Sequence, residues 1–160
     1  GLKLAYIGDA ANNMANSYMV AGVMAGMTVS LASPAEYLPN KTVVAHAETI
    51  GDKTGGSVEV HGDPLAAIKD ADVVVTDTWI SMGQEAEKAK RIQDFAGFTI
   101  DSEMMKHAKA DAIFMHCLPA YRGYEVESEV IDGPQSVIWD EAENRLHAQK
   151  ALLSWLAEQH

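Results

Sequence analysis

The chain has 160 residues, 48% of them hydrophobic, which suits one domain of ordinary size with a buried core. With 23 acidic residues against 12 basic ones, the net charge of −11 argues against a general nucleic-acid binder, which needs clustered Lys and Arg. The single cysteine, Cys117, excludes an internal disulfide and a cysteine-rich zinc site and favours a reducing cytoplasm. No apolar run reaches the roughly 18–20 residues that span a bilayer.

Short apolar, β-rich segments alternate with segments of helical spacing. In chain order we expect a strand at 2–7, a helix at 13–25, a strand at 28–32, a helix at 41–50, a strand at 57–61, a short helix opened by Asp63-Pro64, a strand at 72–76, a helix at 84–95, a strand at 98–100, a helix at 102–109, strands at 112–116 and 136–139, and a helix at 141–158. The alternation predicts an α/β fold in a single domain at 1–160: a Rossmann-like, doubly wound parallel sheet with helices on both faces. We expect the longest loop, 120–134, to be exposed because of charges such as Glu125.

Four polar clusters directly follow predicted strands, where an open parallel sheet binds its ligands. They are Gly-Asp-Ala-Ala-Asn-Asn at 8–13, Asp-Thr-Trp-Ile-Ser-Met-Gly at 77–83, His-Cys-Leu-Pro at 116–119 and Asp-Glu-Ala-Glu-Asn-Arg at 140–145. The first cluster lacks the G-x-G-x-x-G pattern of a dinucleotide site. Its Asn12-Asn13 pair is either a helix cap, which this cluster alone favours, or a pair of amides that binds a small polar ligand.

The other clusters each allow a structural and a functional interpretation. Asp77 is a loop or cap residue, or the partner of a cationic amine. Cys117 is an inert buried thiol, or a thiolate whose pKa a nearby cation lowers. His116 is a poor base for it, because adjacent residues of an extended segment point to opposite faces. Arg145, near the start of the last helix, binds an anion beside the helix N-terminus or pairs with a neighbouring acid such as Glu141.

Together and in this order, the clusters resemble the ornithine carbamoyltransferase family. The segments that carry the resemblance are GDAANNMANS at 8–17, DTWISMG at 77–83, HCLP at 116–119 and EAENR at 141–145. It extends over the whole chain but covers only the second, ornithine-binding domain of that family. The family's first domain, which holds most of the carbamoyl phosphate, carries a Ser-Thr-Arg-Thr-Arg loop and a His-Pro segment, and neither occurs here.

The resemblance implies roles for particular residues. Those expected to bind the α-amino and carboxylate ends of ornithine are Asn13, Asp77, Ser81 and Met82. Those expected where carbamoyl phosphate meets the ornithine side-chain amine are Cys117, Leu118 and Arg145. The resemblance also implies a cis bond between Leu118 and Pro119 and a reaction that needs no metal or organic cofactor.

The implied reaction is attack of the ornithine δ-amine on carbamoyl phosphate, which yields citrulline and phosphate for arginine biosynthesis. An alkylamine has a pKa of about 10.4, so a base must take its proton. We hypothesise that Cys117 is this base, that Asp77 mainly orients the amino acid, and that Arg145 stabilises charge on the carbonyl or phosphate oxygens. Because most phosphate donors are absent, we predict negligible turnover for this chain alone. Family homotrimers form largely through the first domain, so we do not expect this chain alone to form one.

Three other interpretations remain open. The chain could come from a sister carbamoyltransferase whose acceptor is putrescine, N-acetylornithine or aspartate. Ser81-Met82-Gly83 and His116-Cys117 favour ornithine, since an α-amino acid head needs polar groups there. The chain could also be a non-catalytic module that senses an amino acid and needs no partner domain. A nucleotide-binding domain is disfavoured by the missing glycine pattern.

Overall fold

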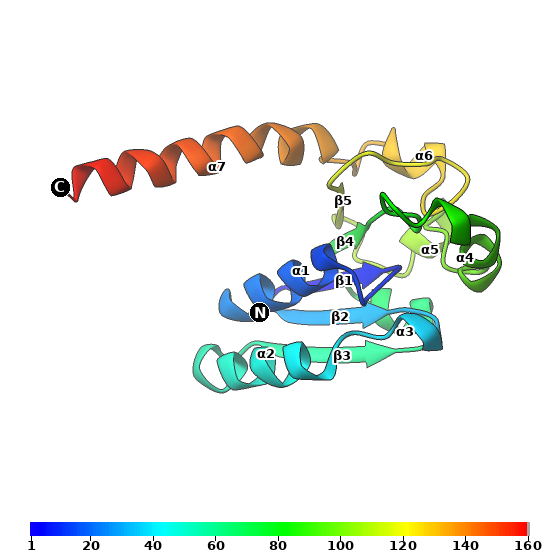
Figure 1. Ribbon diagram of the computed structural model, residues 1–160, viewed down its shortest axis with the longest axis horizontal. Helices are drawn as coiled ribbons and strands as arrows, with labels where there is room; N and C mark the ends of the chain where they lie inside the picture. Colours follow the sequence, from blue (N-terminus) through cyan, green and yellow to red (C-terminus); the bar gives the residue numbers. More distant parts are fainter. Residues whose placement is uncertain (160) are drawn as a thin grey trace.

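The computed structural model of the protein describes residues 1–159. Within this range five parallel strands form one sheet in the order β3-β2-β1-β4-β5, and Figure 1 shows β1, β2 and β3 as neighbouring arrows. The strands are β1 (Lys3–Ile7), β2 (Thr28–Ala32), β3 (Ser57–His61), β4 (Val73–Thr76) and β5 (Ile113–His116). The chain adds β2 and β3 on one side of β1 and then returns to add β4 and β5 on the other. The predicted doubly wound sheet is confirmed, and its strand order reverses between β1 and β4.

Helices connect the strands. They are α1 (Asn13–Met24), α2 (Lys41–Thr54), α3 (Pro64–Ile68), α4 (Lys88–Asp94), α5 (Ser102–Met105), α6 (Ser128–Ile131) and α7 (Ile138–Glu158), with 3-10 turns η1 (Ala35–Tyr37) and η2 (Glu85–Glu87). The sequence predicted a break in α2 at Gly51, but the helix continues past it. A Cβ on Gly51 would come within 2.4 Å of the Gly56 carbonyl oxygen. This glycine therefore permits a close backbone approach and does not end the helix.

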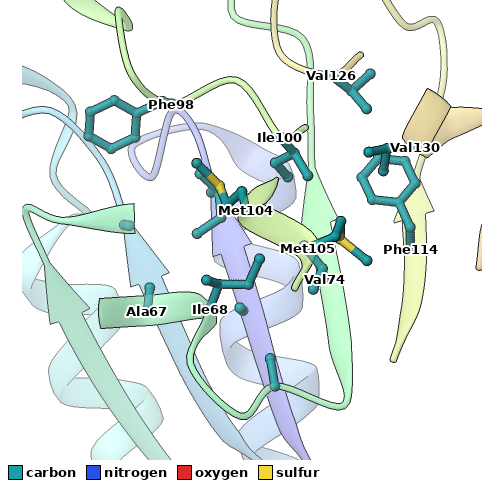
Figure 2. Packing of buried hydrophobic residues seen from close by; sticks show 14 of the residues in the cluster. Ala67, Ile68, Val74, Phe98, Ile100, Met104, Met105, Phe114, Val126 and Val130 are labelled. Atoms are coloured by element: carbon teal, nitrogen blue, oxygen red, sulfur yellow. The ribbon is translucent and has the colours of Figure 1, made fainter. Parts of the chain in front are cut away.

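The sheet divides its side chains between two cores, because successive strand residues point to opposite faces. On β1, Leu4 and Tyr6 join the core beneath α1 and α2, while Ala5 and Ile7 join the core on the other face. Figure 2 shows this second core, with side chains from α3, α5, β4 and β5: Ile68, Met104, Met105, Val74 and Phe114. Helices thus cover both faces, as predicted.

Two predicted strands are wrong. Residues 98–100 and 136–139 meet the rest of the chain through isolated bridges, of Ile100 with Val126 and of Ser136 with Phe114. After Ser136 the backbone turns at once into α7, whose first residue, Ile138, is buried. One bridging pair in each segment is too little pairing for a strand.

The segment 120–134 is not the exposed loop that the sequence predicted. It contains α6, and its apolar residues Val126, Val130 and Ile131 are buried in the core. Glu125, expected on the surface, is fully buried and its carboxylate is hydrogen-bonded to His116. Packing of these apolar residues holds the segment 120–134 against the core, and Glu125 is buried as a consequence.

Helix α7 projects away from the body of the molecule, as the red end of the ribbon in Figure 1 shows. Ile138 is its one buried residue in the described part of the helix. Its exposed large apolar side chains are Trp139, Leu146, Leu152, Leu153, Trp155 and Leu156. An uncovered apolar surface of this extent is typical of a face that packs against another protein surface. Across residues 1–159, no helix has the length and apolar character needed to cross a membrane.

Candidate functional site

A cavity of about 660 Å³ opens where β4 and β5 end, next to the first turns of α1 and α7. It lies by the reversal of strand order between β1 and β4, the place where open α/β sheets bind ligands. All seven residues predicted for the site line it: Asn13, Asp77, Ser81, Met82, Cys117, Leu118 and Arg145. The fold therefore brings the predicted set together, while the role of each residue stays a prediction.

Asp77, directly after β4, is 7% exposed. Its Oδ1 accepts hydrogen bonds from the Thr78 N–H at 2.7 Å and the Cys117 thiol at 3.3 Å. Its Oδ2 accepts one from the Asn12 amide at 3.1 Å. None of these donors is charged, so they orient the carboxylate without neutralising it. Such a group is suited to bind the ammonium of a ligand.

The two asparagines before α1 have different positions. Asn12 caps the helix, since its Oδ1 accepts from the Ala15 N–H at 2.8 Å, and its Nδ2 donates to Asp77 and to the Tyr6 hydroxyl. Asn13 begins the helix, is exposed and lines the cavity. The cap interpretation is confirmed for Asn12, while a ligand contact at Asn13 stays a prediction.

Cys117 follows β5, and its partly buried thiol donates to Asp77. Burial, and next the negative charge of Asp77, raise the pKa of the Cys117 thiol to about 12. The thiol is therefore neutral near pH 7 in this state of the protein. A cation that offset the Asp77 charge would remove the second of these causes and favour the thiolate.

His116 is fully buried, and its imidazole is hydrogen-bonded to residues other than Cys117. Its Nδ1 accepts from the Leu118 N–H at 2.9 Å, so Nε2 carries the proton and donates to the Glu125 carboxylate at 3.3 Å. Both ring nitrogens are engaged with other partners, so neither is free to take a proton from Cys117, although the two side chains lie closer together than the opposite-face argument implied. The same bonds support Leu118 at a left-handed φ of 58°, before the cis bond to Pro119 that the resemblance implied.

Ligand atoms of Asp77, His116 and Cys117 lie within 4.8 Å of one another, a grouping that can hold a metal ion. His116, however, has no free nitrogen lone pair, because one nitrogen accepts a hydrogen bond and the other is protonated. Asp77 and Cys117 would remain as ligands, fewer than the three or four protein ligands usual for zinc. The donor set therefore does not fit a resident metal.

Ser81 and Met82 lie between β4 and η2, and Met82 is 98% exposed. The start of their segment is tied to the sheet. The buried Arg91 guanidinium donates to the Trp79 carbonyl oxygen at 3.0 Å and to the Asp9 carboxylate at 2.8 Å. The backbone of the segment is therefore held in place at Trp79. The two predicted ligand residues, Ser81 and Met82, lie in the more exposed part that follows.

Arg145 is exposed and lies on α7, one turn after Glu141. An ion pair between Arg145 and Glu141, one of the two interpretations of the sequence, is not found among residues 1–159. Glu141 instead accepts a hydrogen bond from the Tyr18 hydroxyl at 2.6 Å. Arg145 itself lines the cavity.

Several cavity residues were not predicted from the sequence: Glu85, Lys88, Tyr121 and Tyr124. They lie on the segments for which the sequence predicted a helix at 84–95 and an exposed loop at 120–134. No local motif marks them, because their place in the cavity depends on how these segments fold over the sheet edge.

Comparisons with known proteins agree with this geometry. The family model for the aspartate/ornithine carbamoyltransferase Asp/Orn binding domain matches residues 1–156. The ornithine carbamoyltransferase of Renibacterium salmoninarum is 61% identical over 99% of this chain and 51% of its own length. The structure of ornithine carbamoyltransferase from Pyrococcus furiosus is 51% identical, with a TM-score of 0.87 over 96% of this chain and 49% of that one. An N-acetyl-L-ornithine transcarbamylase is 31% identical, with a TM-score of 0.82 over 98% and 49%.

The chain spans about half the length of the curated relatives that it matches. The match is continuous over nearly all of this chain and includes the segments that line the cavity. The chain therefore belongs to the aspartate/ornithine carbamoyltransferase family, in which it matches the Asp/Orn-binding domain.

Proposed function

We propose that this chain is the ornithine-binding half of an ornithine carbamoyltransferase, which makes citrulline and phosphate from L-ornithine and carbamoyl phosphate. The observation that carries the proposal is the convergence of all seven predicted residues on one cavity at the switch point of the sheet. Ornithine is preferred over N-acetylornithine because identity is 61% with the ornithine enzyme and 31% with the N-acetyl-L-ornithine enzyme. Arginine biosynthesis in the cytoplasm is the corresponding cellular role.

The acceptor is held by its amino-acid head. The uncompensated Asp77 carboxylate binds the α-ammonium group by a charge-assisted hydrogen bond. Asn13, Ser81 and Met82, which line the same cavity, contact the rest of the head through amide, hydroxyl and backbone groups. This arrangement leaves the δ-amine to extend toward Cys117.

In the transfer, the δ-nitrogen bonds to the carbonyl carbon, the carbon–oxygen bond to phosphate breaks, and phosphate leaves with the electron pair. The amine proton must go to a base. Cys117 can act as this base only after the pKa of its thiol falls. The α-ammonium group of ornithine, bound beside Asp77, provides a positive charge that lowers this pKa. Arg145 stabilises the charge that grows on the carbonyl or phosphate oxygens.

A second domain completes the site. Among residues 1–159, the cations that line the cavity are Arg145 and Lys88, and the sequence has no Ser-Thr-Arg-Thr-Arg segment, so few donors are present to bind a phosphate. The uncovered apolar surface of α7 fits packing against further protein. We therefore propose that the chain alone has negligible turnover and that the complete protein acts as a homotrimer.

A chimera tests the proposal. Residues 1–160 replace the matching half of the Renibacterium salmoninarum enzyme, and phosphate release and the carbamoylated product are measured with ornithine, putrescine and aspartate as acceptors. We expect citrulline from ornithine with the chimera and none above background with the chain alone. A folded chimera that uses putrescine and ignores ornithine would overturn the acceptor assignment. A folded chimera inactive with every acceptor would favour the non-catalytic amino-acid-binding module.

A further inference from the structure

One side-chain hydrogen bond joins α7 to the rest of the described chain. The Tyr18 hydroxyl on α1 donates to Oε1 of Glu141 at 2.6 Å, across a separation of 123 residues. The other side-chain hydrogen bonds of α7 within residues 1–159 stay inside the helix, as between His147 and Glu143. The start of α7 is otherwise held by the buried Ile138 and by its N-cap residue Val137, whose N–H donates to the Phe114 carbonyl oxygen at 2.9 Å.

Two features stabilise the hydrogen bond between Tyr18 and Glu141. Burial, and next the hydrogen bond to Glu141, raise the pKa of Tyr18, so its hydroxyl keeps its proton and donates. The Tyr18 ring lies 6.2 Å from the ring of Tyr6, whose hydroxyl accepts from Asn12. Tyr18 is thus anchored in the same network that orients Asp77.

Glu141 and Arg145 are four residues apart, so they share one face of α7. Both line the cavity. The rotation and tilt of the first turns of α7 therefore decide where the Arg145 guanidinium stands, and the Tyr18 bond limits both. Arg145 itself has no ion pair among residues 1–159 that would hold it in place.

We propose that Tyr18 is a positioning residue that places Arg145 in the cavity by holding Glu141. The inference rests on the proposed function, in which Arg145 meets the carbamoyl phosphate. Tyr18 lies on α1 and is not among the seven predicted site residues. Its hydroxyl acts on the Arg145 guanidinium through the side chain of Glu141.

Tyr18→Phe removes the hydroxyl and keeps the ring. Tyr37→Phe is its matched control, because the Tyr37 hydroxyl also donates to a carboxylate, that of Asp94, at 2.6 Å, and neither residue lines the cavity. In the chain itself, we expect Tyr18→Phe to speed amide hydrogen exchange in residues 142–146 at least tenfold and Tyr37→Phe to leave it unchanged. Equal exchange in the two variants would overturn the proposal.

The second readout is a double-mutant cycle in the chimera described above. We expect Tyr18→Phe to lower kcat/KM for carbamoyl phosphate at least fivefold with little change in KM for ornithine, and to have no further effect when Arg145→Ala is present. A loss that is the same with and without Arg145 would show that Tyr18 acts by another route. If the unmodified chimera makes no citrulline, the proposed function fails, and the exchange measurement alone decides whether Tyr18 holds α7.

Discussion

The two sides of the cavity are built differently. On one side, Asp77 and Cys117 follow the neighbouring strands β4 and β5, are largely or partly buried and are hydrogen-bonded to each other. On the other side, Met82 is 98% exposed and Arg145 is exposed on a projecting helix. The Asp77 carboxylate, proposed to bind an ammonium group, is thus already oriented at the edge of the sheet. The residues expected to close over the ligand instead lie on the exposed part of the 77–83 segment and on helix α7.

This difference assigns the two sides to different stages of ligand binding. A carboxylate that three neutral donors already orient needs little rearrangement to bind a cation. An exposed loop and an exposed helix lose conformational freedom when they close on a ligand, so their contribution grows once a second domain orders them.

The largest effect concerns the reactivity of Cys117. With its pKa raised to about 12 from about 9, the folded protein holds roughly a thousandfold less thiolate near pH 8 than an exposed thiol does. Alkylation by iodoacetamide should be slower by a similar factor than in the unfolded chain. Asp77→Asn should speed it, since the Asp77 charge raises the pKa, while burial keeps it below the unfolded rate. An unchanged rate in Asp77→Asn would show that Asp77 does not control the thiol.

The same shift predicts a pH dependence of folding. Because the folded pKa of Cys117 is raised, its contribution to stability is fully present below about pH 9 and is lost as pH rises toward 12. Urea unfolding of the wild type and Cys117→Ala at pH 7.5 and 10 should show the wild type losing more stability than the variant over this interval.

Breaking the support beneath the 77–83 segment should cost stability. Arg91→Met leaves the buried Asp9 carboxylate without its cation, and we expect a loss of about 3 kcal/mol in the free energy of unfolding, measured in urea. Arg122→Met, which breaks the exposed pair with Asp132, is the control and should change little. Equal losses would contradict the view that the Arg91 pair is the structural support.

Asp77→Asn should weaken binding of L-ornithine at least tenfold, because the ammonium then meets a neutral amide. Isothermal titration on the chain gives the affinity. Asp94→Asn removes a carboxylate bonded to Tyr37 and Lys90 outside the cavity, and its ornithine affinity should match the wild type. A similar loss in both variants would indicate a general charge effect and no specific head-group contact.

The smallest effect on folding is expected on the open side. Met82→Ala should change the free energy of unfolding by less than about 0.5 kcal/mol, because the side chain is exposed. It should still weaken ornithine binding in the chimera. A large loss of stability would show that this segment is packed more firmly than its exposure indicates.

The five strands of the sheet and the polar segments after β1, β4 and β5 could be predicted because they depend on local signals, whereas the resemblance to ornithine carbamoyltransferases singled out the seven cavity residues. Buried strands such as Val73–Thr76 end in polar residues, and parallel strands place such ends on one edge. The burial of Glu125 could not be predicted, since it follows from the packing of Val126 and Val130 and from a partner, His116, on another segment. The contact of Tyr18 with Glu141 joins distant helices and likewise has no local motif.

The central claim is that the cavity recognises the α-amino acid head of ornithine. The most direct test is a nuclear magnetic resonance titration of the chain with L-ornithine and, separately, with putrescine, which has both amines but no α-carboxylate. We predict that ornithine shifts the amides of Asn13 and of residues 77–82 and that putrescine binds at least tenfold more weakly. Tight binding of putrescine with ornithine ignored, or shifts remote from this cavity, would contradict the account.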